Sequence, residues 1–246
     1  MEASSHGEPS FAMKLQPLRD ALPILAALMF LMVWDYVGLD RPLAHLYGNA
    51  NGFAWRDQWL TAGLMHGGVR ALAWVAFGLL LIGVWRPLPF ARQLTHRERA
   101  WWLATTLACV VLIPIVKRAS ATSCPWALAE FGGGLANYVP HWALGQHDGG
   151  PGGCFPSAHA ATAFAFLAGC FVLRRTAPLA ARLWLIVVVV AGSALGWVQM
   201  MRGAHYASHV LWTAWICWSL TAISFHISRP WLDDGAGRVR TAVDRA

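Results

Sequence analysis

Residues 183–201 read LWLIVVVVAGSALGWVQMM, nineteen residues in a row without an ionisable side chain. A helix needs about 20 mostly apolar residues to cross the hydrocarbon core of a bilayer. Apolar side chains occupy every face of this stretch, whereas a helix on the surface of a soluble protein has a single apolar stripe. The stretch therefore predicts a transmembrane helix.

Five further apolar runs of similar length accompany this one. They cover residues 22–39, 60–85, 100–116, 157–173 and 206–228, with Asp35 inside the first and Arg70 inside the second. None shows the alternation of polar and apolar residues that a membrane-spanning strand requires. We predict an all-α fold, a polytopic bundle of six transmembrane helices. One membrane domain would cover residues 22–228, between a cytoplasmic N-terminal segment at 1–21 and a cytoplasmic tail at 229–246.

The composition agrees with a membrane protein. Of 246 residues, 57% are apolar and only 13% are charged, which excludes the soluble globular and disordered classes. The net charge of +7 would suggest a nucleic-acid partner in a soluble protein. In a membrane protein, basic residues first report topology, so we predict no nucleic-acid partner.

The basic residues divide unequally between the two sides of the predicted bundle. Thirteen belong to one side: Lys14, Arg19, Arg86, Arg92, Arg97, Arg99, Arg174, Arg175, Arg182, Arg229, Arg238, Arg240 and Arg245. Six belong to the other: Arg41, Arg56, Arg70, Lys117, Arg118 and Arg202. The positive-inside rule then places both termini in the cytoplasm. In a bacterial-type inner membrane, residues 40–59, 117–156 and 202–205 would face the periplasm.

Three short sequences at the predicted outward ends contain basic residues that an apolar bundle does not require. They read KRASATSCPW at 117–126, CFPSAH at 154–159 and QMMRGAHYASH at 199–209. Ionisable residues at membrane depth are costly, which makes such residues candidates for function. A six-helix bundle can bring these three helix ends together, although they are far apart in the sequence.

Together the three sequences resemble the type 2 phosphatidic acid phosphatase (PAP2) superfamily. Its motifs K-x6-R-P, P-S-G-H and S-R-x5-H-x3-D occur in this order on a six-span membrane bundle, and the resemblance covers about residues 100–215. Four of the positions that depart from the pattern are Cys124 in place of Arg, Ala158 in place of Gly, Gln199 in place of Arg and His209 in place of Asp. The chain looks like a divergent branch of the membrane-bound bacterial type.

The resemblance implies the catalytic roles. His205 would be the nucleophile that forms a phosphohistidine, which water then hydrolyses. His159 would protonate the leaving alkoxide and afterwards activate the water. Lys117 would supply positive charge to the phosphate, while Ser157 and Ala158 would offer a hydroxyl and the first amides of a helix.

Helix geometry suggests a replacement for the missing arginine. Arg202 follows Gln199 by three residues, about one helical turn along nearly the same face, so its guanidinium could reach the same phosphate. The missing Asp is harder to replace. His209 lies one turn beyond His205 and would accept its hydrogen bond if neutral.

A carboxylate from an outward loop is an alternative partner for His205. Asp148, Glu130 and Asp57 are the candidates, and the sequence leaves open which of them reaches the imidazole. The mechanism needs no metal and no cofactor. The His205/His209 pair has a spacing that could also bind zinc, but no third ligand lies nearby in the sequence.

Two of the five cysteines fall in the outward loop. Cys124 and Cys154 would form a disulfide in an oxidising periplasm or stay as free thiols, and both possibilities remain open. The other three lie within predicted spans, where Cys acts as a small apolar residue: Cys109, Cys170 and Cys217.

A phosphate site at the membrane interface implies a phosphorylated membrane lipid as substrate, with its tails left in the bilayer. Phosphatidate, phosphatidylglycerophosphate, an isoprenyl diphosphate and a lipid A phosphate all fit this description. We predict a lipid phosphatase. A lipid phosphotransferase with the same intermediate, and a PAP2-like membrane protein without activity, are the alternatives. The sequence leaves the oligomeric state open.

Overall fold

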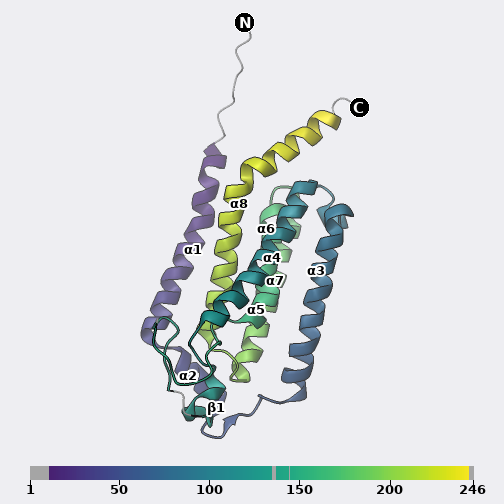
Figure 1. Cartoon of the computed structure of the whole chain (residues 1–246). Helices are drawn as coiled ribbons and strands as arrows, with labels where there is room; N and C mark the ends of the chain where they lie inside the picture. The colour runs from purple at the N-terminus through teal and green to yellow at the C-terminus, as the bar shows by residue number, and fades with distance from the viewer. Residues whose placement is uncertain (1–10, 135–136, 144, 244–246) are drawn as a thin grey trace.

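The computed structural model describes residues 11–134, 137–143 and 145–243 of the chain. Long helices run side by side and form an elongated bundle (Figure 1). These helices are α1 (Phe11–Val37), α3 (Val69–Trp85), α4 (His96–Ala119), α7 (Pro178–Met201) and α8 (Ala207–Val243). A further column consists of α5 (Ala158–Phe164), a 3₁₀ turn η5 (Ala165–Leu167) and α6 (Ala168–Leu173).

The short elements lie between these helices. They are α2 (Asp40–His45), β1 (Gly48–Asn49), β2 (Gly52–Phe53), the π-helical η1 (Trp59–Gly68) and the 3₁₀ turns η2 (Pro89–Ala91), η3 (Pro125–Ala127) and η4 (Ala129–Phe131). The two strands pair antiparallel, with Gly48 opposite Phe53. The fold is thus mostly helical, as predicted.

Each of the six predicted runs is helical over most of its length, but they do not qualify equally as membrane spans. Within the described residues, four helices are long and apolar enough to cross a membrane: Pro17–Val37, His96–Ala119, Pro178–Met201 and Ala207–Asp233. Val69–Trp85 and Ala158–Leu173 are apolar but shorter. The second is interrupted by η5, and its residues are almost all buried inside the bundle. The count of six spans stays a prediction.

The helices also extend beyond the predicted domain boundaries. Helix α1 begins at Phe11, inside the predicted N-terminal segment 1–21, and α8 continues to Val243, inside the predicted tail 229–246. Residues 1–10 and 244–246 of those segments lie outside the described residues. Helix formation needs only backbone hydrogen bonds, so a helix does not have to end where its apolar run ends.

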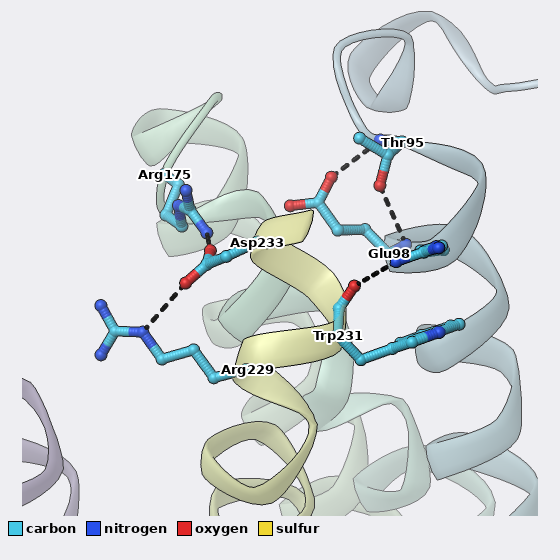
Figure 2. Close-up of polar contacts among 7 residues, drawn as sticks. Thr95, Glu98, Arg175, Arg229, Trp231 and Asp233 are labelled. Atoms are coloured by element: carbon cyan, nitrogen blue, oxygen red, sulfur yellow. Dashed lines mark hydrogen bonds and ion pairs between the residues drawn. The ribbon is translucent and has the colours of Figure 1, made fainter. Parts of the chain in front are cut away.

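The start of α1 and the end of α8 lie at the same end of the bundle, which we call the arginine end (Figure 1). Its ion pairs tie helix ends together (Figure 2): Asp233 of α8 accepts from Arg175 at 2.5 Å and lies 3.5 Å from Arg229. Helix α4 starts there with a capping box, in which Thr95 and Glu98 each accept the other's backbone N–H. This end therefore holds the helix termini in place.

The opposite end carries α2, β1, β2, the loop 120–157 and the turn between α7 and α8, and we call it the histidine end (Figure 1). Glycine allows the helices that lead to it to approach closely. A Cβ at Gly192 of α7 would lie 2.5 Å from the ring of Phe164 in α5, and one at Gly196 would collide with Val210 of α8. Small residues at such crossings are typical of packed membrane helices. They bring α5, α7 and α8 together just below the site.

Candidate functional site

Backbone hydrogen bonds bring the first two motifs together at the histidine end. Directly after α4, Ser120 O accepts from Gly153 N at 2.8 Å, and Thr122 O accepts from Cys154 N at 2.9 Å. The segment before α5 thus runs alongside the segment after α4. This pairing places Lys117, which lies in the last turn of α4, next to the start of α5.

Further backbone hydrogen bonds attach the third motif. Trp126 N donates to Gly203 O at 3.0 Å, and Ser157 N donates to His209 O at 3.2 Å and to Thr213 Oγ1 at 2.9 Å. The turn between α7 and α8 is therefore held against both other motifs. The structure brings the three sequences together as predicted.

The loop between the first two motifs is closed by a disulfide between Cys124 and Cys154. Asp148 holds the same loop, because its carboxylate accepts from Ser123 Oγ at 2.8 Å and from Gly150 N at 2.9 Å. Cys154 is fully buried and Asp148 is 5% exposed, so the loop is anchored within the protein. Of the two states considered for these cysteines, the structure contains the bonded one.

The two predicted catalytic imidazoles face each other. His159 Nδ1 lies 3.5 Å from His205 Nε2, and the ring centroids are 5.6 Å apart. His159 follows Ser157, whose hydroxyl accepts from Ala160 N and caps α5. His205 lies in the turn that precedes α8 and is 2% exposed. The two imidazoles are thus within hydrogen-bond reach of each other.

Burial determines the protonation of His205. Removal from water lowers its pKa well below the ordinary value of 6.5, and the positive charge of Lys117 and the neighbouring His209 and His159 lower it further. The imidazole is therefore neutral at pH 7. A neutral ring has the free nitrogen lone pair that attack on phosphorus requires.

The far nitrogen of His205 has a partner that the sequence did not indicate. His205 Nδ1 lies 3.6 Å from Sγ of Cys154, a disulfide sulfur. The predicted hydrogen bond from His205 to His209 is wrong. His209 is fully buried, its ring centroid is 5.8 Å from that of His205, and neither of its nitrogens has a hydrogen-bond partner among the described residues.

The orientation of His209 explains this correction. Its ring packs edge-on against Tyr206 at 5.3 Å, Phe155 at 5.4 Å and His141 at 5.7 Å between centroids. One helical turn places His209 beside His205, but these aromatic neighbours decide where its nitrogens point.

The three candidate carboxylates do not form a hydrogen bond with His205 either. Asp148 binds the loop, as described above. Glu130 pairs with Arg41 at 2.8 Å and with His45 at 3.3 Å, and Asp57 is exposed beside Arg202. Each of them is occupied elsewhere or lies at the surface.

Two other carboxylates do lie close to the histidines. Asp40, at the start of α2, is 4% exposed and accepts from Ser208 N at 2.9 Å, from Ser208 Oγ and from Trp34 Nε1. Burial raises its pKa although these hydrogen bonds favour the charged form. Ser208 is the neighbour of His209, so Asp40 fixes the first turn of α8.

Asp35 has a similar role at the end of α1. Its Oδ2 accepts from Trp212 Nε1 at 2.9 Å and lies 3.2 Å from His141 Nε2, and His141 stacks on Phe155 at 4.2 Å. Asp35, Asp40 and His141 were not among the site residues predicted from the sequence. Asp35 was visible only as an acidic residue inside an apolar run.

Lys117 and Arg202, the two cations predicted to bind phosphate, have different neighbours. Lys117 is close enough for its charge to affect His205. The guanidinium of Arg202 is held by the carbonyl of Arg56 at 2.9 Å and by Gln199 Oε1 at 3.3 Å. Arg202 is thus joined to Gln199 one turn earlier, and its binding to phosphate stays a prediction. No hydrogen bond between Arg202 and His205 occurs among the described residues.

A groove of about 540 Å³ lies beside the site, between the last turns of α1 and the first turns of α8. Met32, Tyr36, Trp142 and Trp212 line it together with Phe155, which directly precedes the second motif. The groove is almost entirely apolar, and Phe155 separates it from His209. An apolar chain could lie in this groove next to the histidines.

The sequence model of the PAP2 superfamily matches residues 99–232, more than half of the chain and all three motifs. The chain belongs to the PAP2 superfamily. No curated protein and no solved structure matches it. Membership of the PAP2 superfamily supports phosphatase-type activity and association with a membrane, which the four long apolar helices also support.

The structure shows what occupies four of the positions that depart from the PAP2 pattern. Cys124 forms the disulfide, Ala158 opens α5, Gln199 binds Arg202, and His209 packs among aromatic rings. Gln199 is 1% exposed, and its Nε2 has no hydrogen-bond partner among the described residues. The departures are built into the packing of this PAP2 chain.

Proposed function

We propose that the protein is a membrane phosphatase that hydrolyses a lipid phosphate or diphosphate through a phosphohistidine on His205. The observation that carries the proposal is the facing pair His205 Nε2 and His159 Nδ1, 3.5 Å apart at a buried site beside Lys117. Attack by Nε2 forms the nitrogen–phosphorus bond and breaks the bond from phosphorus to the lipid oxygen. His159 gives its proton to that oxygen, which leaves on the lipid alcohol when the substrate is a monophosphate and on the lipid monophosphate when it is a diphosphate.

Water completes the cycle. His159, now neutral, takes a proton from a water molecule, and the resulting hydroxide attacks phosphorus as the bond to His205 breaks. Inorganic phosphate and the free imidazole are the products. Lys117 stabilises the charge on the phosphoryl oxygens in both steps, and the first amide of α5, at Ala158, adds a hydrogen-bond donor together with the hydroxyl of Ser157. Arg202 joins them when its guanidinium gives up the hydrogen bond to Gln199 and binds the phosphate.

The substrate would be a lipid because the site lies beside an apolar groove at one end of the bundle. Its phosphate would reach His205 while a tail rests against Phe155 and Trp212. The positive-inside rule places this end at the periplasmic face of a bacterial-type membrane. A phosphotransferase would use the same intermediate but accept a second lipid hydroxyl in place of water.

The test measures phosphate release by purified protein in lipid vesicles that contain phosphatidate, phosphatidylglycerophosphate, an isoprenyl diphosphate or a lipid A phosphate. At least one should be hydrolysed, and His205→Ala should abolish release. His147→Ala is the matched control, because His147 is an exposed loop histidine. Absence of release with the whole panel would contradict the proposal, and appearance of the phosphate on a second lipid would indicate transfer.

A further inference from the structure

Three side chains at the site could act together as metal ligands once a thiol is available. Sγ of Cys154 and ring nitrogens of His205 and His209 all lie within 4.8 Å of one another. The exposed fractions of these residues are 0%, 2% and 0%. One sulfur and two imidazole nitrogens form a donor set that suits zinc.

The distances fit a tetrahedral ion. Zinc bonds of about 2.3 Å to sulfur and about 2.0–2.1 Å to nitrogen imply a sulfur-to-nitrogen separation of about 3.6 Å around a tetrahedral ion. Cys154 Sγ and His205 Nδ1 are 3.6 Å apart. The separations that involve His209 are within 4.8 Å and would shorten by at most about 1.5 Å to complete three ligands.

His209 provides an independent indication of a ligand. It is fully buried, and both of its ring nitrogens lack a hydrogen-bond partner among the described residues. An unpaired buried polar group lowers stability, because it has lost its hydrogen bonds to water and gained none in the protein. A metal ion bound to one nitrogen would remove part of that cost.

The disulfide prevents this binding, because the Cys154 sulfur is bonded to Cys124 and cannot act as a thiolate. A dithiol reductant would supply two electrons and two protons, break the S–S bond to give two thiols, and become a cyclic disulfide itself. The Cys154 thiol would then release its proton when it binds the metal.

We propose that reduction of the Cys124–Cys154 disulfide creates a zinc site of Cys154, His205 and His209, which stops catalysis. The second part rests on the proposed function. With zinc on Nδ1 of His205, attack by Nε2 on phosphorus would place two electrophiles on one imidazole. The oxidised protein is therefore the active form, and the reduced protein binds zinc.

Two cysteine variants of the full-length protein form a matched test of zinc binding. Cys124→Ser leaves the Cys154 thiol free without any reductant. Cys154→Ser removes the proposed ligand and leaves Cys124 as the free thiol of the pair. After dialysis against zinc, Cys124→Ser should retain about one ion per chain and Cys154→Ser almost none. Cobalt in place of zinc should give a thiolate charge-transfer band in Cys124→Ser alone. Equal metal content in the two variants would overturn the proposal.

Two further variants in the Cys124→Ser background identify the other ligands. His209→Ala should lower zinc affinity about 100-fold, since one of three ligands is lost. Asp35→Asn should not, although Asp35, Asp40 and His141 also lie within 4.8 Å of one another. Loss of zinc in Asp35→Asn with retention in His209→Ala would assign the metal to that second cluster and refute the proposal.

Wild-type protein treated with dithiothreitol provides a second measurement that does not depend on the folding of a variant. Zinc should inhibit phosphate release by the reduced protein, and a chelator should restore it, while the oxidised protein is unaffected. Inhibition of both forms to the same extent would contradict the redox control. If zinc binds as described but no form releases phosphate, the metal site stands and the proposed hydrolase function fails.

Discussion

The two ends of the bundle hold different sets of polar residues. At the arginine end, acidic side chains form ion pairs with basic ones: Asp20 binds Arg174 at 2.7 Å and His226 at 2.9 Å, and Asp233 binds Arg175 at 2.5 Å. These side chains are also partly exposed. At the histidine end, His205 and His209 are buried, and the nitrogens of His209 are unpaired among the described residues.

We infer that the ion pairs of the arginine end stabilise the fold, whereas the buried histidines of the histidine end take part in the proposed chemistry. Partly exposed ion pairs bind helix ends at little cost and contribute about 1 kcal/mol or less each. Buried imidazoles without partners lower stability, and such perturbed groups cluster at functional sites. Substitutions at the arginine end should therefore change stability without changing chemistry, and those at the histidine end should do the reverse.

The largest expected effect concerns proton transfer at the histidine end. His159→Ala should lower kcat for a lipid phosphate by about 1000-fold, because general acid catalysis is lost. An aryl phosphate, whose leaving group needs no proton, should lose much less. Steady-state kinetics with the two substrates make the comparison, and an equal loss for both would show that His159 is not the acid.

The cation beside the histidines should matter next. Lys117→Met should lower kcat/KM by about 100-fold, because a charge that stabilises the phosphoryl oxygens is lost. Arg118→Met is the matched control, since Arg118 is the next residue of α4 and is exposed. Comparable losses in the two variants would show that general surface charge, and not the position of Lys117, supports activity.

The pH dependence is a finer test. Since burial and Lys117 lower the pKa of His205, the acid limb of kcat/KM should lie below pH 6.5, and Lys117→Met should move it upward. Folding responds in the same window. The unfolded state binds this proton more tightly, so the stability conferred by neutral His205 is complete above pH 6.5 and is lost as the pH falls. An acid limb above pH 6.5 in the wild type would contradict this assignment.

The smallest effect on activity is expected at the arginine end. Asp20→Asn should lower the free energy of unfolding by about 1–2 kcal/mol, because Arg174 and His226 lose a charged partner. Phosphate release at a temperature well below unfolding should stay unchanged. Thermal unfolding in detergent and the phosphate assay provide the two readouts, and a loss of activity without a loss of stability would break the contrast between the ends.

The helices could be predicted because their signal is local. The run 183–201 becomes the greater part of α7, Pro178–Met201, and the run 206–228 becomes the first part of α8. Length and apolarity decide whether a segment can enter a bilayer, and neighbouring segments hardly affect this. Burial within the bundle is different, since the interrupted column at Ala158–Leu173 is enclosed by helices that its own residues do not specify.

The site was only partly predictable. Ser157 as a helix cap follows from local sequence, and the three motifs follow from their order and spacing. The predicted hydrogen bond of His209 failed because Tyr206, Phe155 and His141 turn its ring. Asp40 was missed because it meets Ser208, a residue 168 positions away in the chain.

By itself the sequence determined that the chain forms apolar helices and carries a PAP2-type set of basic residues at their ends. Hydropathy and motif spacing are properties of contiguous segments, so they can be read without coordinates. The tertiary structure alone decided which groups touch His205: a disulfide sulfur on one side and His159 on the other. Those contacts join residues about 50 positions apart, and their geometry depends on how whole helices pack.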